Sequence, residues 1–277
     1  MNDVSAKSLG RYPGLEGRVA VITGVSRRQG IGCAIAARLA SAGAHLMLAH
    51  YRPHDERQPW GPDDIPHVLD EIRSQQVHEA QRMVDVSIDL AEADVPARLM
   101  AQAVAAFGHV DILICNHALS GQDGPIGELT TEMLDAHWAV NTRSSLLLVQ
   151  EFARQHDGRP GGRVVLMTSG QGLGPMPGEI AYAATKAALA GVTLTLADQL
   201  ADVGITVNTV NPGPVDTGYM TPEVLRQVAP MFPFGRMGEP DDPARLVAWL
   251  ASDDGAWMTG QVLNTEGGFA RWRSPAT

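Results

Sequence analysis

The sequence predicts an α/β fold in which a doubly wound parallel sheet lies between two layers of helices. Short apolar runs alternate with longer segments of helical periodicity along nearly the whole chain. Such alternation is typical of βαβ units, whose crossover helices cover both faces of a parallel sheet. A chain of 277 residues with 44% hydrophobic residues can bury a core of that size.

The predicted elements follow one another in a regular order. Predicted strands span 18–23, 45–49, 83–88, 110–115, 162–168, 205–211 and 261–264. Predicted helices span 31–42, 65–75, 94–107, 132–155, 181–203 and 240–251, and the Pro- and Gly-rich segments 53–66 and 212–240 are expected loops at the sheet edge. The expectation is a seven-stranded, three-layer α/β/α sheet of the Rossmann type, in a single domain over 1–277.

Composition narrows the function classes. A formal net charge of −10 disfavours a nucleic acid or an anionic membrane as partner and favours a small molecule. Cys33 and Cys115 lie in apolar segments without metal-ligand spacing, so we expect buried thiols, no metal site and a reducing compartment. No unbroken apolar run reaches about eighteen residues, and 1–17 lack an apolar signal region, so we expect a cytoplasmic protein.

A glycine-rich turn, TGVSRRQGIG at 23–32, joins the first predicted strand to the first predicted helix. Its glycines would let backbone N–H groups approach a pyrophosphate at the helix N-terminus. An ordinary tight turn has the same composition, but the position at the first strand favours dinucleotide binding. The candidate cofactor contacts here are Gly24, Ser26, Arg27, Arg28, Gly30, Ile31 and Gly32.

Ser169 precedes a second candidate group, Tyr182 and Lys186. Residues four apart share one face of a helix, so Tyr182 and Lys186 would project into one site. A free tyrosine has a pKa of about 10, and a neighbouring ammonium lowers this pKa toward neutral pH, where a tyrosine can act as an acid/base. Taken alone, this spacing also fits packing and solvent-facing residues.

Together these motifs resemble the short-chain dehydrogenase/reductase family in its single-domain branch, with similarity to 3-oxoacyl-[acyl-carrier-protein] reductases. The resemblance spans 17–268 and includes the glycine turn, Asn116, Asn141, the Ser169/Tyr182/Lys186 set, NTVNPGPVDT at 208–217 and GQVLNTEGG at 260–268. It implies that Ser169 binds the substrate oxygen and that Tyr182 passes the proton. Lys186 would hold the nicotinamide ribose, and Asn141 would anchor a water chain.

The resemblance also implies cofactor contacts beyond the glycine turn. Asp89 and Leu90 would touch the adenine, with Asp85 as the alternative to Asp89, which we prefer because it directly follows the apolar run. Asn116 would support the adenosine half, and the nicotinamide would be framed by Pro212, Gly213, Val215 and Thr217.

The sequence departs from the family pattern at three places. The glycine turn is two residues longer than TGxxxGxG. His117 stands in the motif after the fourth strand, where we expect it to pack or line the cleft rather than act as a base. The loop 53–64 is longer than usual and has no role that the resemblance assigns.

Cofactor choice depends on the end of the second strand, where NAD enzymes place an acid for the ribose hydroxyls. This chain has His50, Tyr51 and Arg52 there, and Arg27 and Arg28 lie in the glycine turn. We expect Tyr51 and the arginines to favour NADP(H) over NAD(H), although these arginines also fit a solvated surface.

Two further segments bear on substrate and assembly. Residues 217–240 are expected to form a substrate lid, and their Met and Phe side chains fit either an apolar substrate or simple packing. The helix at 181–203 is apolar on more than one face, which suggests a homotetramer or else a dimer.

The expected activity is hydride transfer between a nicotinamide and a ketone or secondary alcohol. Reduction of a 3-oxoacyl-type carbonyl is the first expectation, and oxidation of a sugar or secondary alcohol is the second. A non-catalytic dinucleotide-binding protein is a different class, which the presence of Ser169, Tyr182 and Lys186 together disfavours. Divergent enoyl reductases, with a longer Tyr–Lys spacing, and the longer sugar-nucleotide epimerases are also disfavoured.

Overall fold

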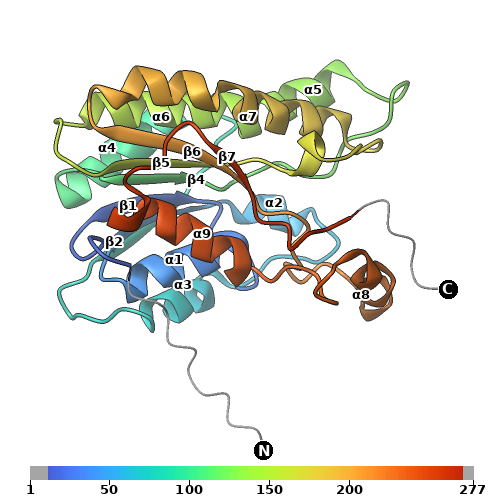
Figure 1. The fold of residues 1–277 in the computed structure, drawn as a ribbon, viewed down its shortest axis with the longest axis horizontal. Helices are drawn as coiled ribbons and strands as arrows, with labels where there is room; N and C mark the ends of the chain where they lie inside the picture. Colours follow the sequence, from blue (N-terminus) through green and yellow to red (C-terminus); the bar gives the residue numbers. More distant parts are fainter. Residues whose placement is uncertain (1–11, 271–277) are drawn as a thin grey trace, which may run out of the picture.

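The computed structural model describes residues 12–270 and confirms the predicted α/β architecture. One seven-stranded, all-parallel sheet has the order β3-β2-β1-β4-β5-β6-β7, and helices cover both of its faces (Figure 1). The strands are β1 (Val19–Thr23), β2 (His45–His50), β3 (Met83–Ser87), β4 (Ile112–Cys115), β5 (Gly162–Met167), β6 (Ile205–Asn211) and β7 (Val262–Asn264).

The helices form two layers. The α-helices are α1 (Ile31–Ser41), α2 (Arg52–Glu56), α3 (Ile65–Arg73), α4 (Val95–Phe107), α5 (Thr131–His137), α6 (Ser144–Gln155), α7 (Ile180–Ala201), α8 (Pro222–Val228) and α9 (Asp241–Ala251). Helices α1, α3 and α9 lie on one face of the sheet, and α4, α6 and α7 lie on the other (Figure 1). Each layer buries its own apolar cluster against the sheet.

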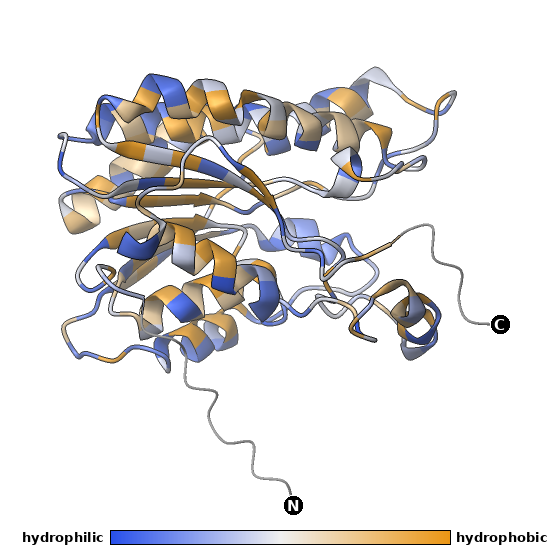
Figure 2. Ribbon diagram, in the orientation of Figure 1, coloured by the Kyte–Doolittle hydropathy of each residue, from blue (hydrophilic) through white to orange (hydrophobic). Residues whose placement is uncertain are grey.

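The central strands are buried along their whole length and are mostly apolar. Every residue of β1, β4 and β5 is buried, as expected for a parallel sheet that is covered on both faces. Figure 2 shows hydrophobic strands at the centre and helices of mixed hydropathy around them. The chain crosses from β1 toward β2 and β3 and then returns to β4, so the strand order reverses between β1 and β4. In such sheets a ligand crevice lies at the carboxyl ends of the strands beside this reversal.

The helix expected over 132–155 is interrupted. A π-helix, η1 (Trp138–Arg143), separates α5 from α6. The wider turn of a π-helix accommodates an extra residue, and such turns are frequent at functional sites. Here η1 contains Asn141, which is fully buried and hydrogen-bonded to two other segments.

The two segments expected as loops contain short helices. Helix α2 begins just before Pro53, and Pro222 opens α8, where the Thr221 hydroxyl accepts a hydrogen bond from the Val224 amide at 3.3 Å. A proline in the first turn leaves no donor unsatisfied and has a φ suited to a helix, so these prolines start helices here.

Helix α7 is apolar overall but has no unbroken apolar run of about eighteen residues, because Lys186 and Asp198 interrupt it. Among the helices of residues 12–270, it alone is long and apolar enough by length and composition to cross a bilayer. It packs against β6 and η1 and carries Tyr182 and Lys186.

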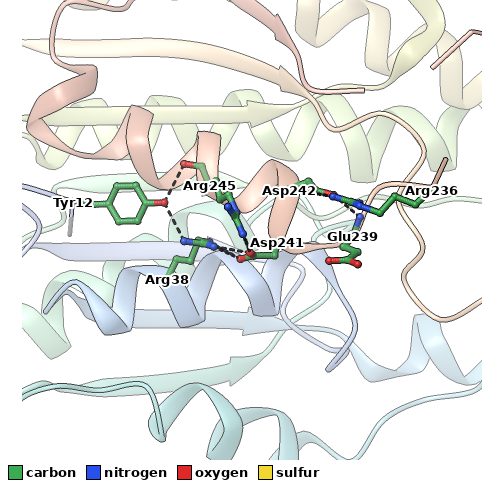
Figure 3. Close-up of polar contacts among 7 residues, drawn as sticks. All are labelled: Tyr12, Arg38, Arg236, Glu239, Asp241, Asp242 and Arg245. Carbon is green, nitrogen blue, oxygen red and sulfur yellow. Dashed lines mark hydrogen bonds and ion pairs between the residues drawn. The ribbon is translucent and has the colours of Figure 1, made fainter. Parts of the chain in front are cut away.

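A polar cluster joins α1 to α9 (Figure 3). The nearly buried Arg38 donates two hydrogen bonds to the Asp241 carboxylate, at 2.5 and 2.6 Å, and one to the Tyr12 hydroxyl at 3.1 Å. Burial alone would raise the pKa of Asp241, but hydrogen bonds from Arg38 and Arg245 lower it below its ordinary value. The next residue, Asp242, binds Arg236 with both carboxylate oxygens and so fastens the end of the segment 217–240 to α9.

We expect Asp241→Ala to destabilise the protein by about 3 kcal/mol, because it leaves the buried Arg38 guanidinium without its carboxylate. The exposed Asp70–Arg73 pair is the control, and Asp70→Ala should cost less than about 0.5 kcal/mol. Denaturant unfolding measures both values. Because the pKa of Asp241 is lowered by folding, its contribution is present above about pH 4 and is lost as pH falls through the lower folded value. Equal losses of unfolding free energy in Asp241→Ala and Asp70→Ala would contradict a stabilising role for the buried pair.

Candidate active site

A cleft of about 490 Å³ opens at the carboxyl ends of β1, β2 and β4, beside the reversal in strand order. Many of the sequence-predicted residues lie on its wall. They are Gly24, Ser26, Arg27, Gly30, Ile31, Tyr51, Asp89, Leu90, Asn116, Tyr182 and Thr217. Asp89 lines the cleft, whereas its alternative Asp85 lies outside the lining and binds His50 at 3.2 Å.

The glycine turn packs closely on the loop after β4. Asn116 donates from its amide nitrogen to the carbonyl oxygens of Thr23 and Gly24, both at 3.1 Å. A Cβ on Gly32 would lie 2.4 Å from the Gly24 carbonyl oxygen, and one on Gly24 would lie 2.8 Å from the His117 Cα. Gly24 also has a φ of +74°, which favours glycine. These glycines therefore allow the close approach of the two loops that floor the cleft.

His117 is a packing residue with a full set of hydrogen-bond partners. Its Nδ1 lies 2.6 Å from the Thr23 hydroxyl, and its Nε2 lies 2.7 Å from the Ser144 hydroxyl and 2.9 Å from the Val140 carbonyl oxygen. Burial lowers its pKa to about 3, so the imidazole is neutral. The geometry agrees with the expectation that His117 packs at the cleft rather than acting as a base.

Tyr182 and Lys186 project from the same face of α7, as their spacing predicts. The Lys186 ammonium lies 5.6 Å from the centroid of the Tyr182 ring and donates to the Met167 carbonyl oxygen at 2.9 Å. Ser169 follows β5 and makes a hydrogen bond that favours the ionised form of Tyr182. Three residues from two segments thus meet beside the cleft, and of the three Tyr182 lines its wall.

The protonation of this pair differs from the sequence expectation. Burial raises the pKa of Tyr182 to about 12, against the opposing effect of the hydrogen bond with Ser169. Burial also lowers the pKa of Lys186 to about 8. The expectation that Lys186 lowers the pKa of Tyr182 is therefore wrong for this structure, because desolvation of the phenolate outweighs stabilisation by neighbouring groups. Tyr182 is a protonated phenol at neutral pH.

Asn141 links the loop after β4 to α7. Its side chain accepts from the Leu119 amide at 2.7 Å and donates to the Thr185 hydroxyl at 3.1 Å. The Thr185 hydroxyl in turn donates to the Tyr182 carbonyl oxygen at 2.7 Å. Asn141 lies outside the cleft lining, so its expected role in a water chain stays a prediction.

Asp123 is a residue of the site that the sequence did not indicate. Its carboxylate accepts hydrogen bonds from the backbone N–H groups of Ala181 at 3.0 Å and Tyr182 at 2.7 Å. These are first-turn donors of α7, which has no capping side chain of its own at Glu179. Despite its desolvation, the hydrogen bonds from Tyr182 and Ala181 lower the pKa of Asp123. Only the fold brings Asp123 to Tyr182, since the two are separated by 59 positions.

Two of the expected phosphate-binding arginines point elsewhere. Arg28 binds Glu71 at 2.9 Å, and Arg52 binds Glu56 at 3.4 Å, and neither lines the cleft. Exposed carboxylates within reach hold both guanidinium groups at the surface. Arg27 does line the cleft, with its guanidinium carbon 5.3 Å from the centroid of the Trp60 ring.

The unassigned loop supplies part of the cleft wall. Its lining residues are His54, Asp55, Arg57 and Trp60. Arg57 favours the ionised form of the Tyr51 phenol, whereas a hydrogen bond with Asp89 is the main cause that raises the pKa of Tyr51. The loop 53–64 thus forms one side of the cleft near Tyr51 and Asp89.

The segment expected at the nicotinamide follows β6. Gly213 has a φ of +69°, and a Cβ there would lie 2.7 Å from the Glu266 Cα. Val215 is buried and pairs with Gly238 as an isolated bridge, while Thr217 reaches the cleft. Pro212, Gly213 and Val215 therefore shape the backbone that leads to Thr217 without lining the cleft themselves, as is also true of Lys186, Ser169 and Gly32.

The cleft has the polar groups that a dinucleotide requires. Arg27 Nε and Trp60 Nε1 are buried and have no hydrogen-bond partner within residues 12–270, and the same is true of Asp55 Oδ2. Unpartnered buried donors fit an anionic ligand, and an unpartnered carboxylate oxygen fits a hydroxyl. The residues present therefore fit a nucleotide with phosphates and riboses. No group of His, Cys, Asp and Glu in the described part of the chain is arranged to hold a metal ion.

Comparisons with known proteins agree with this geometry. A family model described as "Enoyl-(Acyl carrier protein) reductase" matches residues 24–270. The chain is 43% identical to the uncharacterized oxidoreductase YjdA of Bacillus subtilis, over 92% of this chain and 97% of the relative. It is 35% identical to an NADPH-dependent aldehyde reductase-like chloroplastic protein of Arabidopsis thaliana, over 92% of this chain and 95% of that protein.

Solved structures give the same result. The short-chain dehydrogenase/reductase from Serratia marcescens BCRC 10948 is 34% identical and superposes with a TM-score of 0.78, covering 92% of this chain and 99% of that one. The resemblance inferred from the motifs is confirmed, and so is the expectation of an enzyme that uses a nicotinamide dinucleotide. The chain belongs to the short-chain dehydrogenase/reductase family and is an oxidoreductase.

Proposed function

We propose that this oxidoreductase is an NADP(H)-dependent carbonyl reductase in which Tyr182 is the proton donor. The observation that carries the proposal is the position of Tyr182, which lines the cleft beside Ser169 and Lys186 and is a neutral phenol. A protonated phenol is the form required to deliver a proton to the oxygen of a carbonyl. The arrangement is therefore suited to the proton-transfer step of carbonyl reduction.

The bound dinucleotide supplies the hydride, and the residues of this chain manage the charge that develops on the substrate oxygen. A carbonyl oxygen gains negative charge as its carbon is reduced. The Ser169 hydroxyl donates a hydrogen bond to that oxygen, and the Tyr182 hydroxyl donates a proton to it. Lys186 places a positive charge beside the resulting phenolate, and its pKa of about 8 allows it to exchange a proton near neutral pH.

Arg27 and Arg57 support the choice of NADP(H). Both line the cleft, and Arg57 acts on Tyr51 at the end of β2, where the 2′-phosphate of the adenosine ribose is expected. They take the place of Arg28 and Arg52, whose side chains bind glutamates. The NADPH-dependent relative in Arabidopsis thaliana supports the same choice.

Asp55 favours NAD(H) as the cofactor of a second candidate function, an NAD(P)-dependent dehydrogenase of a sugar or secondary alcohol. Its buried carboxylate lines the cleft and has an unpartnered oxygen, which suits a ribose hydroxyl. The first substrate class that we propose is a ketone of the 3-oxoacyl type, by similarity to 3-oxoacyl-[acyl-carrier-protein] reductases.

We further propose a single domain over 1–277, of which 1–11 and 271–277 lie outside the described residues, with 217–240 as its substrate lid. A homotetramer, or else a dimer, would cover the outer face of α7, where Leu194 is 68% exposed. Sedimentation analysis distinguishes the two states. Cytoplasmic localisation is consistent with Cys33 and Cys115, which are free and buried.

Replacing Tyr182 by Phe removes the proton donor and keeps the ring. We expect turnover of a ketone panel with NADPH to fall by about 10²- to 10⁴-fold, the usual contribution of general acid catalysis. Nucleotide affinity, followed by nicotinamide fluorescence, should change by less than about threefold, since a single hydroxyl is lost from the cleft wall. Undiminished turnover in Tyr182→Phe would rule out this role.

Replacing Arg57 by Gln tests the cofactor preference. We expect the Kd for NADPH to rise about tenfold or more while the Kd for NADH changes little, because only the 2′-phosphate requires the charge. Arg52→Gln is the matched control, since Arg52 is next to the same strand but lies outside the cleft lining. Equal effects of Arg57→Gln on both nucleotides would refute the assignment.

Asp123 is expected to position Tyr182. Asp123→Ala should lower kcat by about tenfold or more and leave the Kd for NADPH unchanged, because the displaced helix turn misplaces the proton donor. Asp123→Asn, which keeps an acceptor oxygen, should restore part of the loss. The control Thr130→Ala removes the cap of α5 and should cost about 1 kcal/mol of stability without a comparable fall in kcat. Equal kcat values for all three variants would show that Asp123 only stabilises the fold.

A further inference from the structure

The lengthened glycine turn and the long loop 53–64 contact each other, and Arg27 and Trp60 bring this contact to the cleft wall. The lengthened glycine turn contains Arg27 and Arg28, and the long loop contains Trp60 and Asp63. The Arg28 amide donates to the Asp63 carboxylate at 2.8 Å, and the Arg27 guanidinium stacks on the Trp60 ring. The extra residues of the turn and of the loop therefore form one contact surface.

The start of the lid segment joins the same surface. The rings of Trp60 and Tyr219 lie 5.6 Å apart between centroids, at an angle of 47°. Gly218 approaches the glycine turn so closely that a Cβ there would lie 2.1 Å from Gln29 Oε1. Trp60 thus bridges the glycine turn to the lid, and we call Arg27, Trp60 and Tyr219 the Trp60 clamp.

Two donors of the Trp60 clamp are left without partners. Arg27 Nε and Trp60 Nε1 are buried, and neither has a hydrogen-bond partner among residues 12–270. Both residues line the cleft. A buried donor without a partner is costly, so two of them on one wall indicate a ligand with acceptor oxygens. The phosphates of a dinucleotide have such oxygens.

We propose that the Trp60 clamp closes over the phosphate-bearing part of the bound dinucleotide, so that release of the nucleotide requires the contact between Trp60 and Tyr219 to open. The inference rests on the proposed function and adds Trp60 and Tyr219 to the nucleotide site, beside the already expected Arg27. Tyr219 also lies close enough to Tyr182 to disfavour its ionisation, so the clamp reaches from the glycine turn to the catalytic residue.

The test is the rate at which NADPH leaves the full-length protein. Rapid mixing of the NADPH complex with excess NADP⁺ is followed by nicotinamide fluorescence. We expect Trp60→Ala to release NADPH about five- to tenfold faster, the size of an aromatic contact converted to a rate. Trp60→Phe keeps a ring against Tyr219 but loses the indole N–H. Its release rate should therefore lie between those of the wild type and Trp60→Ala. Trp257→Ala is the control, because Trp257 is 98% exposed and lies outside the cleft.

A double-mutant cycle separates the clamp from a general loosening of the loop. Tyr219→Ala changes a side chain that is 42% exposed, so the variant is expected to fold. If the clamp exists, Trp60→Ala and Tyr219→Ala together should speed release little more than either alone. The clamp would be overturned if the double variant released NADPH faster by the product of the two single effects. It would also be overturned if the single variants released NADPH at the wild-type rate. Binding of neither NADPH nor NADH by the wild type would instead overturn the proposed function and the clamp with it.

Discussion

The proposed chemistry depends on two ionisable side chains that the packing of α7 on the sheet brings together, the buried Lys186 and the half-buried Tyr182 on the cleft wall. Lys186 is 2% exposed, and its ammonium is held by the Met167 carbonyl oxygen at the end of β5. Burial disfavours the charged form of each group, so the phenol stays protonated and the ammonium loses its proton more easily. The parallel sheet provides the rigid base that this burial requires, and the cleft opens beside it.

Most of the fold could be predicted from local sequence patterns. Short apolar runs indicate strands buried on both faces, and helical periodicity indicates helices with one buried face. The strand over 205–211 has the predicted bounds, since Ile205, Val207 and Val210 are buried in a sheet that is covered on both faces. Hydrophobic periodicity could not reveal the π-helix η1, because its extra residue is stabilised by contacts of Asn141 with Leu119 and Thr185. The expectation of loops at 53–66 and 212–240 was wrong for α2 and α8, because Pro, which usually indicates a loop, starts a helix in each.

The candidate site was predictable where spacing along one element decides it, as for Tyr182 and Lys186. It was not predictable where distant segments meet. Asp123 reaches the first turn of α7 only through the fold, and Arg28 is held away from the cleft by Glu71 on α3. In the sequence, the long glycine turn and the long loop are two separate differences from the family pattern. In the structure they contact each other through Arg27 and Trp60 and through the Arg28 amide and Asp63.

Donation of a proton to a carbonyl requires Tyr182 to be a neutral phenol. The most direct measurement is the ultraviolet difference absorbance of tyrosinate during an alkaline titration, compared between wild type and Tyr182→Phe. The difference between the two proteins isolates the ionisation of Tyr182. The account predicts that this ionisation occurs well above the ordinary value near 10, toward a pKa of about 12. Ionisation of Tyr182 near neutral pH would contradict it.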